Sequence, residues 1–127
     1  MVVRQNRPVN LDLTKFSFPI TAIVSILHRL SGLLLFILIP FLLGALQYSL
    51  TGRSQFNELK ACLTNPVVLF IIWLCLSALI YHIVAGVRHL LMDIGFGEGL
   101  AAGRQSSFWV FGISIVLAIL AGIGFIV

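Results

Sequence analysis

The chain has 127 residues, of which 60% are hydrophobic and only 9% are charged, and its formal net charge is +4. Soluble domains carry about 25% charged residues, so this composition excludes a water-soluble globular protein and indicates one small integral membrane bundle. The basic excess is better explained by membrane topology than by nucleic-acid binding, because no basic stripe or stacking platform accompanies it.

Three stretches of the chain contain no Lys, Arg, Asp or Glu. A helix needs about 20 residues to cross the hydrocarbon core, so each stretch can span the membrane once. Membrane strands are disfavoured because the stretches show no sustained alternation of apolar and polar residues. The sequence therefore predicts an all-α integral membrane protein with a bundle of three transmembrane helices, built on residues 30–52, 61–87 and 105–127.

The helix boundaries follow from prolines and capping residues. Pro19 suits the first turn of a helix, and Pro40 predicts a bend in its middle. Asn65 or Thr64 is the expected cap before Pro66. In chain order we predict a cytoplasmic segment at 1–18, a first transmembrane helix at 19–50, an external loop at 51–64, a second helix at 65–92, a cytoplasmic loop at 93–104 and a third helix at 105–127.

The basic residues predict the orientation in the membrane. Most of them fall on one side of the predicted bundle, where cytoplasmic segments are enriched in Lys and Arg. We therefore expect a cytoplasmic N-terminus and an external C-terminus. The cytoplasmic set is Arg4, Arg7, Lys15, Arg88 and Arg104, and the external set is Arg53 and Lys60.

A first polar cluster, Ser25-Ile-Leu-His28-Arg29-Leu-Ser31-Gly32, lies near the start of the first helix. Ionisable groups at membrane depth are costly and therefore indicate function. Ser25 and Arg29 are four residues apart, so they share a helix face and can hydrogen-bond the carbonyl oxygen of a quinone head group. The alternative is that Arg29 only extends to the inner membrane surface and contributes to topology.

A second cluster, Tyr81-His82-Ile-Val-Ala-Gly86-Val-Arg88-His89-Leu-Leu-Met-Asp93, ends the second helix. His82 is a candidate axial ligand of a haem, with Gly86 one turn away leaving room for a flat macrocycle. His89 and Arg88 would then lie near the haem rim. The alternative is a histidine hydrogen-bonded to a neighbouring helix. A haem would need its second ligand from another chain.

Both clusters together resemble the two signature segments of the cytochrome b556 anchor subunits of succinate dehydrogenase, the larger membrane anchors of respiratory complex II. The first signature is Arg7-Pro8-Val-Asn10-Leu followed by the Ser25 to Gly32 cluster, and the second runs from His82 to Gly95. With the three-span layout, the resemblance covers nearly the whole chain.

The resemblance implies a non-catalytic anchor in the bacterial inner membrane that pairs with a second small haem-binding anchor subunit. In such a pair each anchor would give one histidine to a shared b-type haem, here His82, while His28, Arg29 and His89 would lie near the haem propionates. By the same resemblance, Ser25 and Arg29 would line the ubiquinone pocket. The pair docks an iron-sulfur subunit that carries a flavoprotein, which passes electrons from succinate of the tricarboxylic acid cycle to ubiquinone.

Three other functions remain open at the level of sequence. A related quinol:fumarate reductase would use the same kind of anchor in the reverse direction. A small transporter or channel subunit would use the intramembrane His and Arg as an ion path. An assembly protein without a cofactor would use them for packing only.

Overall fold

A computed structural model describes residues 18–125 of the chain. It has four helices: α1 (Ile20–Leu50), α2 (Arg53–Cys62), α3 (Pro66–Asp93) and α4 (Leu100–Gly124). The three long ones are apolar enough to cross a membrane, and residues 18–125 contain no strand, so the predicted all-α fold with three spans is confirmed. The N-terminal basic residues and the signature segment at Arg7 to Leu11 lie outside the described residues.

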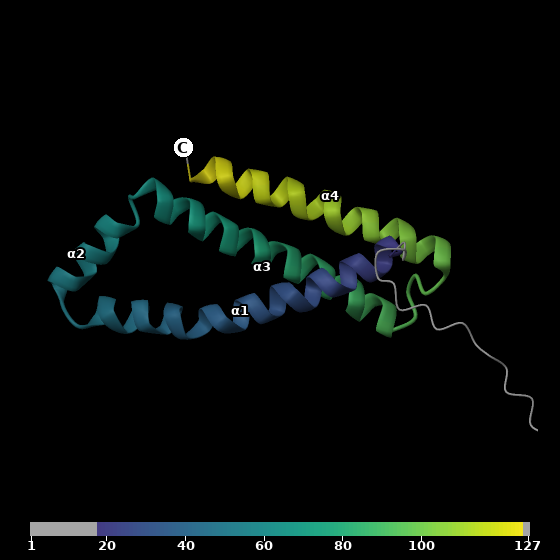
Figure 1. The fold of residues 1–127 in the computed structure, drawn as a ribbon, viewed down its shortest axis with the longest axis horizontal. Coiled ribbons are helices and arrows are strands. Elements are labelled where there is room, and N and C mark those ends of the chain that lie inside the picture. Colours follow the sequence, from purple (N-terminus) through teal and green to yellow (C-terminus); the bar gives the residue numbers. More distant parts are fainter. Residues whose placement is uncertain (1–17, 126–127) are drawn as a thin grey trace, which may run out of the picture.

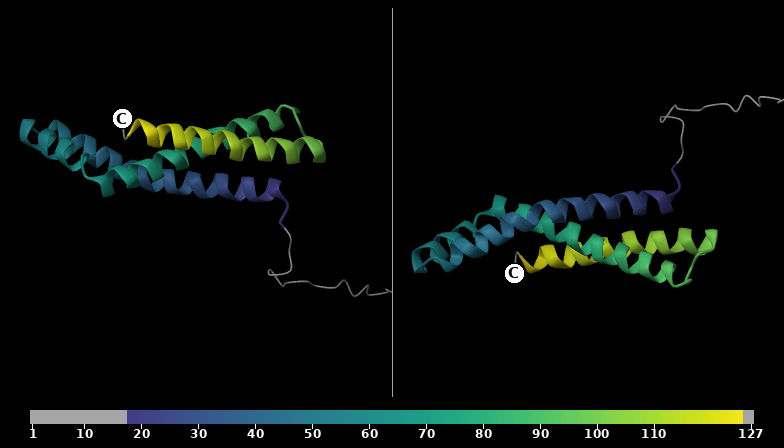
Figure 2. Two further views of the ribbon diagram at one scale, coloured as in Figure 1. Left: turned by 90° about the horizontal axis from the view of Figure 1, so that it is seen from above. Right: turned by 90° about the horizontal axis from the view of Figure 1, so that it is seen from below.

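The three long helices form an antiparallel arrangement with one shared end. The start of α1, the end of α3 and the start of α4 lie together, while α2 joins the opposite ends of α1 and α3 (Figure 1). The views in Figure 2 show α4 lying along α3, and α1 lying to one side of this pair of helices. Residues far apart in sequence, near the start of α1 and the end of α3, are thereby brought to one level of the bundle.

The local signals at the helix starts explain the boundaries of α1 and α3. Asn65 caps α3 as predicted: its side-chain Oδ1 accepts a hydrogen bond from the backbone N–H of Val67 at 2.9 Å, with Pro66 at the first helical position. Pro19 is the N-cap of α1 and not part of its first turn, with extended backbone at φ −64° and ψ 147°. Pro40 lies inside α1, whose ribbon is curved in Figure 1.

Two segments differ from the sequence prediction. The predicted external loop contains the short helix α2, which is tied to α1 by the Tyr48 hydroxyl donating to Glu58 Oε2 at 2.7 Å. The last long helix begins at Leu100, five residues before the predicted start, so Arg104 belongs to its first turns. The uncharged run marks only the part of a helix that suits the lipid core, and a helix can begin before it.

The turn between α3 and α4 depends on glycine. Gly95 and Gly97 have φ values of +89° and +77°, in the left-handed region that side chains with a Cβ atom disfavour. These two residues reverse the chain within a few positions. The reversal brings the polar start of α4 alongside the end of α3.

A small core forms where α1, α3 and α4 meet. Val24, Ala85 and Val110 are buried there, one from each long helix, with Tyr81 and Phe111 packed around them. The Tyr81 hydroxyl also donates a hydrogen bond to the backbone carbonyl of Val24 at 3.0 Å. This joins α3 to α1 at the residue next to His82, and one turn before His28 on α1, and it fixes the relative height of the two helices.

The half of α1 that leads to α2 has little contact with the rest of the bundle. Val24 and Ser31 are the buried residues of α1, so residues 32–50 contribute none. Large side chains such as Phe36 and Phe41 are about 70% exposed there, at 71% and 69%. Apolar exposure of this kind suits lipid or a neighbouring subunit, because helix association in membranes depends on close packing rather than on removal from water.

At the other end of the bundle, Trp73 near the start of α3 packs against Gly122 near the end of α4. Trp73 Nε1 donates to the carbonyl of Ala118 at 2.8 Å, and a Cβ atom at Gly122 would lie 2.9 Å from that same nitrogen. We expect Gly122→Ala to destabilise the assembled protein by about 1–3 kcal/mol, because the indole must move and its hydrogen bond must weaken. Thermal unfolding in detergent measures this loss.

The matched control for that prediction is Gly112→Ala on the same helix, where an added Cβ meets nothing within 4 Å. It should leave the melting temperature unchanged or raise it slightly, because alanine favours a helix over glycine. Equal melting temperatures for the two variants would contradict close packing of Trp73 against Gly122.

Candidate functional site

All three histidines of the chain meet at the shared end of the bundle. The rings of His28 on α1 and His82 on α3 are stacked, with centroids 4.3 Å apart and planes at 15°. His89, two turns further along α3, lies 5.0 Å from His28 in a tilted arrangement. The antiparallel arrangement predicted from sequence thus brings the imidazoles of both polar clusters to a common level.

Each stacked histidine lies on a glycine of the opposite helix. A Cβ atom at Gly32 would be 3.0 Å from His82 Cε1, and one at Gly86 would be 3.3 Å from His28 Nε2. The relation is reciprocal: His28 and Gly32 are one turn apart on α1, and His82 and Gly86 are one turn apart on α3. The interpretation of Gly86 as an open approach for a macrocycle is wrong in this structure, because the His28 ring lies against it.

The hydrogen bonds around His82 determine which of its nitrogens carries the proton. His82 Nδ1 lies 3.0 Å from Ser31 Oγ and 3.2 Å from the carbonyl oxygen of His28. The carbonyl can only accept, and the Ser31 hydroxyl already donates its proton to that carbonyl at 2.8 Å. Both contacts are therefore satisfied when Nδ1 carries the hydrogen, which leaves Nε2 with its lone pair.

An imidazole with this hydrogen-bonding pattern is suited to bind a metal. Metal-binding histidines usually donate the other ring N–H to a carbonyl or a similar acceptor, which fixes the tautomer and the ring orientation. Within residues 18–125 there is no group of three or more His, Cys, Asp or Glu side chains that could hold a metal ion. The lone pair on His82 Nε2 can supply a single ligand, as an axial position of a haem requires.

Arg88 takes a different role from the one predicted beside His89. Its side chain is 7% exposed and points to α4, where Nε donates to Ser106 Oγ at 2.9 Å and Nη2 donates to the carbonyl of Gly103 at 3.2 Å. A buried guanidinium needs such partners, especially at membrane depth. Arg88 therefore joins α3 to α4 rather than the haem rim. His89 Nε2 is buried without a hydrogen-bond partner in the described part of the chain.

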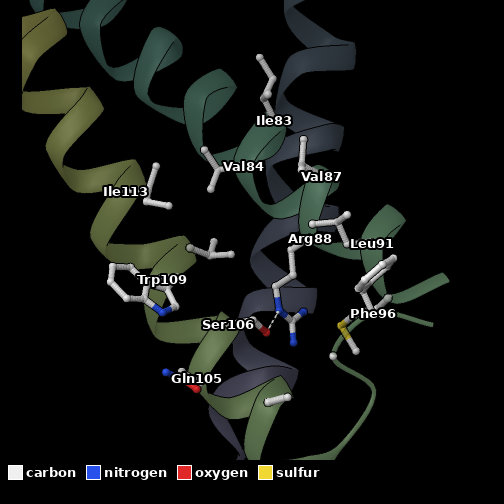
Figure 3. A pocket seen from close by; sticks show the side chains of 14 residues that line it. Ile83, Val84, Val87, Arg88, Leu91, Phe96, Gln105, Ser106, Trp109 and Ile113 are labelled. Carbon is white, nitrogen blue, oxygen red and sulfur yellow. Dashed lines mark hydrogen bonds between the residues drawn. The ribbon is translucent and has the colours of Figure 1, made fainter. Parts of the chain in front are cut away.

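An apolar cavity of about 620 Å³ lies between α3 and α4, on the Arg88 side of the bundle. Figure 3 shows Ile83, Val84 and Ile113 along it, with the hydrogen bond from Arg88 to Ser106 at its edge. None of the three histidines lines this cavity. This cavity is a groove between two helices and is separate from the histidine cluster.

Ser25 and Arg29 lie on α1 beside the histidine cluster but do not join it. Ser25 is partly buried and Arg29 is exposed, and neither lines the cavity between α3 and α4 or the one at the start of α4. Their four-residue spacing puts them on one face of α1, next to the face that carries Val24, His28 and Ser31. The pair is thus reachable from outside the chain, and other groups would have to complete any pocket around it.

Ser31 belongs to the first polar cluster, where the sequence alone gives it no separate role. A signal was available, because Ser31 is three residues after His28 and therefore shares its helix face. The partners of Arg88, Ser106 and Gly103, were also missed. Gly103 falls in the predicted loop at 93–104, and Ser106 falls within the predicted helix at 105–127, where nothing in the sequence pairs it with Arg88.

Comparison with known proteins identifies the family. Residues 3–121 match the family described as Succinate dehydrogenase/Fumarate reductase transmembrane subunit. The chain is 44% identical to the succinate dehydrogenase cytochrome b556 subunit of Coxiella burnetii over 118 residues, covering 92% of this chain and 94% of that protein. It is 32% identical to the subunit of the same name from Paracoccus denitrificans, over 99% and 97% of the two chains. A cytochrome b560 subunit from Marchantia polymorpha is 34% identical over 72% of this chain and 70% of its own length. The chain therefore belongs to the transmembrane cytochrome b subunits of the succinate dehydrogenase/fumarate reductase family.

Proposed function

We propose that this chain is the larger membrane anchor of a succinate:ubiquinone oxidoreductase and that His82 is an axial ligand of a b-type haem shared with a second anchor subunit. The observation that carries the proposal is the hydrogen bonding of His82, whose Nδ1–H has acceptors on α1 while Nε2 keeps its lone pair. Membership of a cytochrome b family supports the choice of haem over other metal groups.

The residues around His82 fit such a group. His28 and His89 lie within 5.0 Å of one another by ring centroid and supply polar nitrogens at the same level, and the buried His89 Nε2 has a hydrogen-bonding capacity that no described residue uses. Together with Arg29 they are the proposed partners of the haem propionates. When bound, the haem would accept and release single electrons.

Ser25 and Arg29 are the proposed contribution of this chain to the ubiquinone site. The Ser25 hydroxyl and the Arg29 guanidinium share one face of α1, and both can donate a hydrogen bond to a quinone carbonyl. The permanent charge of Arg29 stabilises the negative charge that the head group gains on reduction. The exposure of Arg29 leaves it free for a substrate that enters from the lipid.

The chain by itself is proposed to be non-catalytic. It would anchor an iron-sulfur subunit, and through it a flavoprotein subunit, at the bacterial inner membrane. The apolar outer half of α1, without buried residues, offers a surface for the second anchor. The chain would hold the head group of the quinone within electron-transfer distance of the iron-sulfur subunit.

The proposed orientation has a direct test. We expect an alkaline phosphatase domain fused after residue 127 to be active and a green fluorescent protein fused there to be dark, because the C-terminus would lie outside. Fusions placed in the α3–α4 turn should give the opposite pair of results. A fluorescent C-terminal fusion would contradict the proposed cytoplasmic N-terminus.

The function itself is tested by purifying the complex through an affinity tag on this chain. The proposal predicts that a flavoprotein, an iron-sulfur protein and a second three-helix anchor copurify, and that reduced-minus-oxidised spectra show b-type haem bands. A fumarate-reducing relative would give the same spectra but would reduce fumarate with quinol faster than it oxidises succinate. A transporter or channel subunit would copurify without flavin and without haem.

A further inference from the structure

We propose that Ser31 is a positioning residue for His82: its hydroxyl fixes the protonated nitrogen and the plane of this imidazole and so sets the electron donation of Nε2 to iron. The inference rests on the proposed haem ligation by His82 and adds to it a residue that the ligand assignment does not contain. Three residues within about one turn of α1 enclose the His82 ring, and Ser31 is the central one.

The contacts of the ring define this enclosure. The His28 ring covers one face of His82 at a centroid distance of 4.3 Å, and Gly32 leaves the space into which His82 Cε1 projects. Ser31 Oγ and the carbonyl of His28 lie at Nδ1, at 3.0 and 3.2 Å. Residues of α1 thus contact the face of the His82 ring, its Cε1 edge and its Nδ1 atom. The other ring nitrogen, Nε2, has no hydrogen-bond partner among these contacts.

The Ser31 hydroxyl acts as a link in a short hydrogen-bond chain. His82 Nδ1–H donates to Ser31 Oγ, and the Ser31 hydroxyl donates to the carbonyl of His28 at 2.8 Å. Each bond polarises the next, so the hydroxyl is a better acceptor for Nδ1–H than an isolated serine would be. Ser31 is 8% exposed, so water does not readily replace it.

This arrangement has a chemical consequence for Nε2. An acceptor at Nδ1–H draws the proton outward and makes the imidazole a stronger electron donor to a bound metal. Stronger donation favours the ferric over the ferrous state. Loss of the Ser31 hydroxyl should therefore make the haem easier to reduce. It should also give the His82 imidazole more freedom to rotate about its Cβ–Cγ bond.

The first test compares Ser31→Ala with Ser31→Thr in the purified whole complex. For Ser31→Ala we expect a more positive haem midpoint potential and altered g-values of the low-spin ferric electron paramagnetic resonance signal. Ser31→Thr keeps the hydroxyl and should retain both properties of the wild type. The matched control is Ser49→Ala, because Ser49 also donates to the carbonyl three residues before it on α1, at 2.7 Å from Leu46, but at the other end of the helix.

The second test approaches the same ring from Gly32 and does not need a stable Ser31→Ala complex. Gly32→Ala adds a Cβ atom 3.0 Å from His82 Cε1, so the ring must shift and the g-values should change. Gly44→Ala, also on α1 but with nothing within 4 Å of the added atom, should leave them unchanged.

The outcomes separate this inference from the proposed function. If His82→Leu leaves the haem bands intact, the ligand assignment fails and the role of Ser31 falls with it. If His82→Leu removes the bands but Ser31→Ala keeps the wild-type potential and g-values, or Ser31→Thr shifts them equally, His82 remains the ligand and Ser31 does not position it. Should Ser31→Ala fail to assemble, wild-type g-values in Gly32→Ala would overturn the enclosure by α1.

Discussion

Replacing His82 with leucine is expected to remove nearly all b-type haem absorbance from the purified complex. Leucine has no lone pair to offer, and its apolar side chain is compatible with the membrane-spanning helix, so the bundle should survive the change. The Ser31 hydroxyl keeps its own acceptor, the carbonyl of His28, and no unpaired donor is created there. The measurement is the reduced-minus-oxidised spectrum, normalised to the flavin content of the same preparation.

The control for this experiment is His89→Leu, which removes a second imidazole from α3 near the same end of the bundle. His89 lies 5.0 Å from His28 but is not the proposed ligand. Its loss should shift the bands or weaken haem retention by a modest factor while the bands remain. Bands of wild-type height in His82→Leu, or an equal loss in both variants, would remove the basis for assigning the ligand to His82.

Replacing Arg29 with leucine is expected to lower succinate-driven ubiquinone reduction roughly ten- to a hundredfold. A hydrogen bond to a charged group contributes about 1.5–3 kcal/mol, which corresponds to this range in rate. The succinate-driven reduction of a soluble dye should stay within about twofold, because the proposed flavoprotein and iron-sulfur subunits would carry out that reaction without the quinone site. The split between the two assays isolates the quinone step.

Two further variants sharpen the Arg29 experiment. Arg29→Lys keeps the charge but loses the planar fork of donors, so it should recover only part of the quinone activity. Arg104→Leu removes another exposed arginine, on the early part of α4, and should leave both assays unchanged. Equal losses of quinone and dye reduction in Arg29→Leu would indicate damage to the docking of the soluble subunits and would speak against a quinone role.

The sequence was sufficient for the fold and for the meeting of the two polar clusters. Runs without charge locate three spans, and the alternation of span direction then requires the start of the first and the end of the second to share a membrane side. Asn65 before Pro66 is a local cap signal, and it was confirmed because it depends on neighbouring residues alone. Features of this kind follow from spacing and local chemistry.

The hydrogen-bond and packing partners of individual side chains could not be predicted from the sequence. Arg88 has polar candidates on several sides, and only the packing of α4 against α3 decides that it bonds Ser106 and Gly103 rather than lying beside His89. The space over Gly86 is filled by His28 because of the crossing of α1 over α3, which no pattern in a single helix encodes. The site assignments at Ser25, Arg29, His28 and His89 remain predictions for the experiments above.

His28 packs against Gly86 and His82 packs against Gly32, and these two contacts allow only one axial register between α1 and α3. A slip of one turn, about 5.4 Å, would bring Phe36 or His28 to the place that Gly32 now occupies opposite His82. The same slip would break both contacts, because each helix carries one histidine and one glycine four residues apart. Gly32 and Gly86 thus determine the level at which the imidazole of His82, the proposed haem ligand, lies along the bundle.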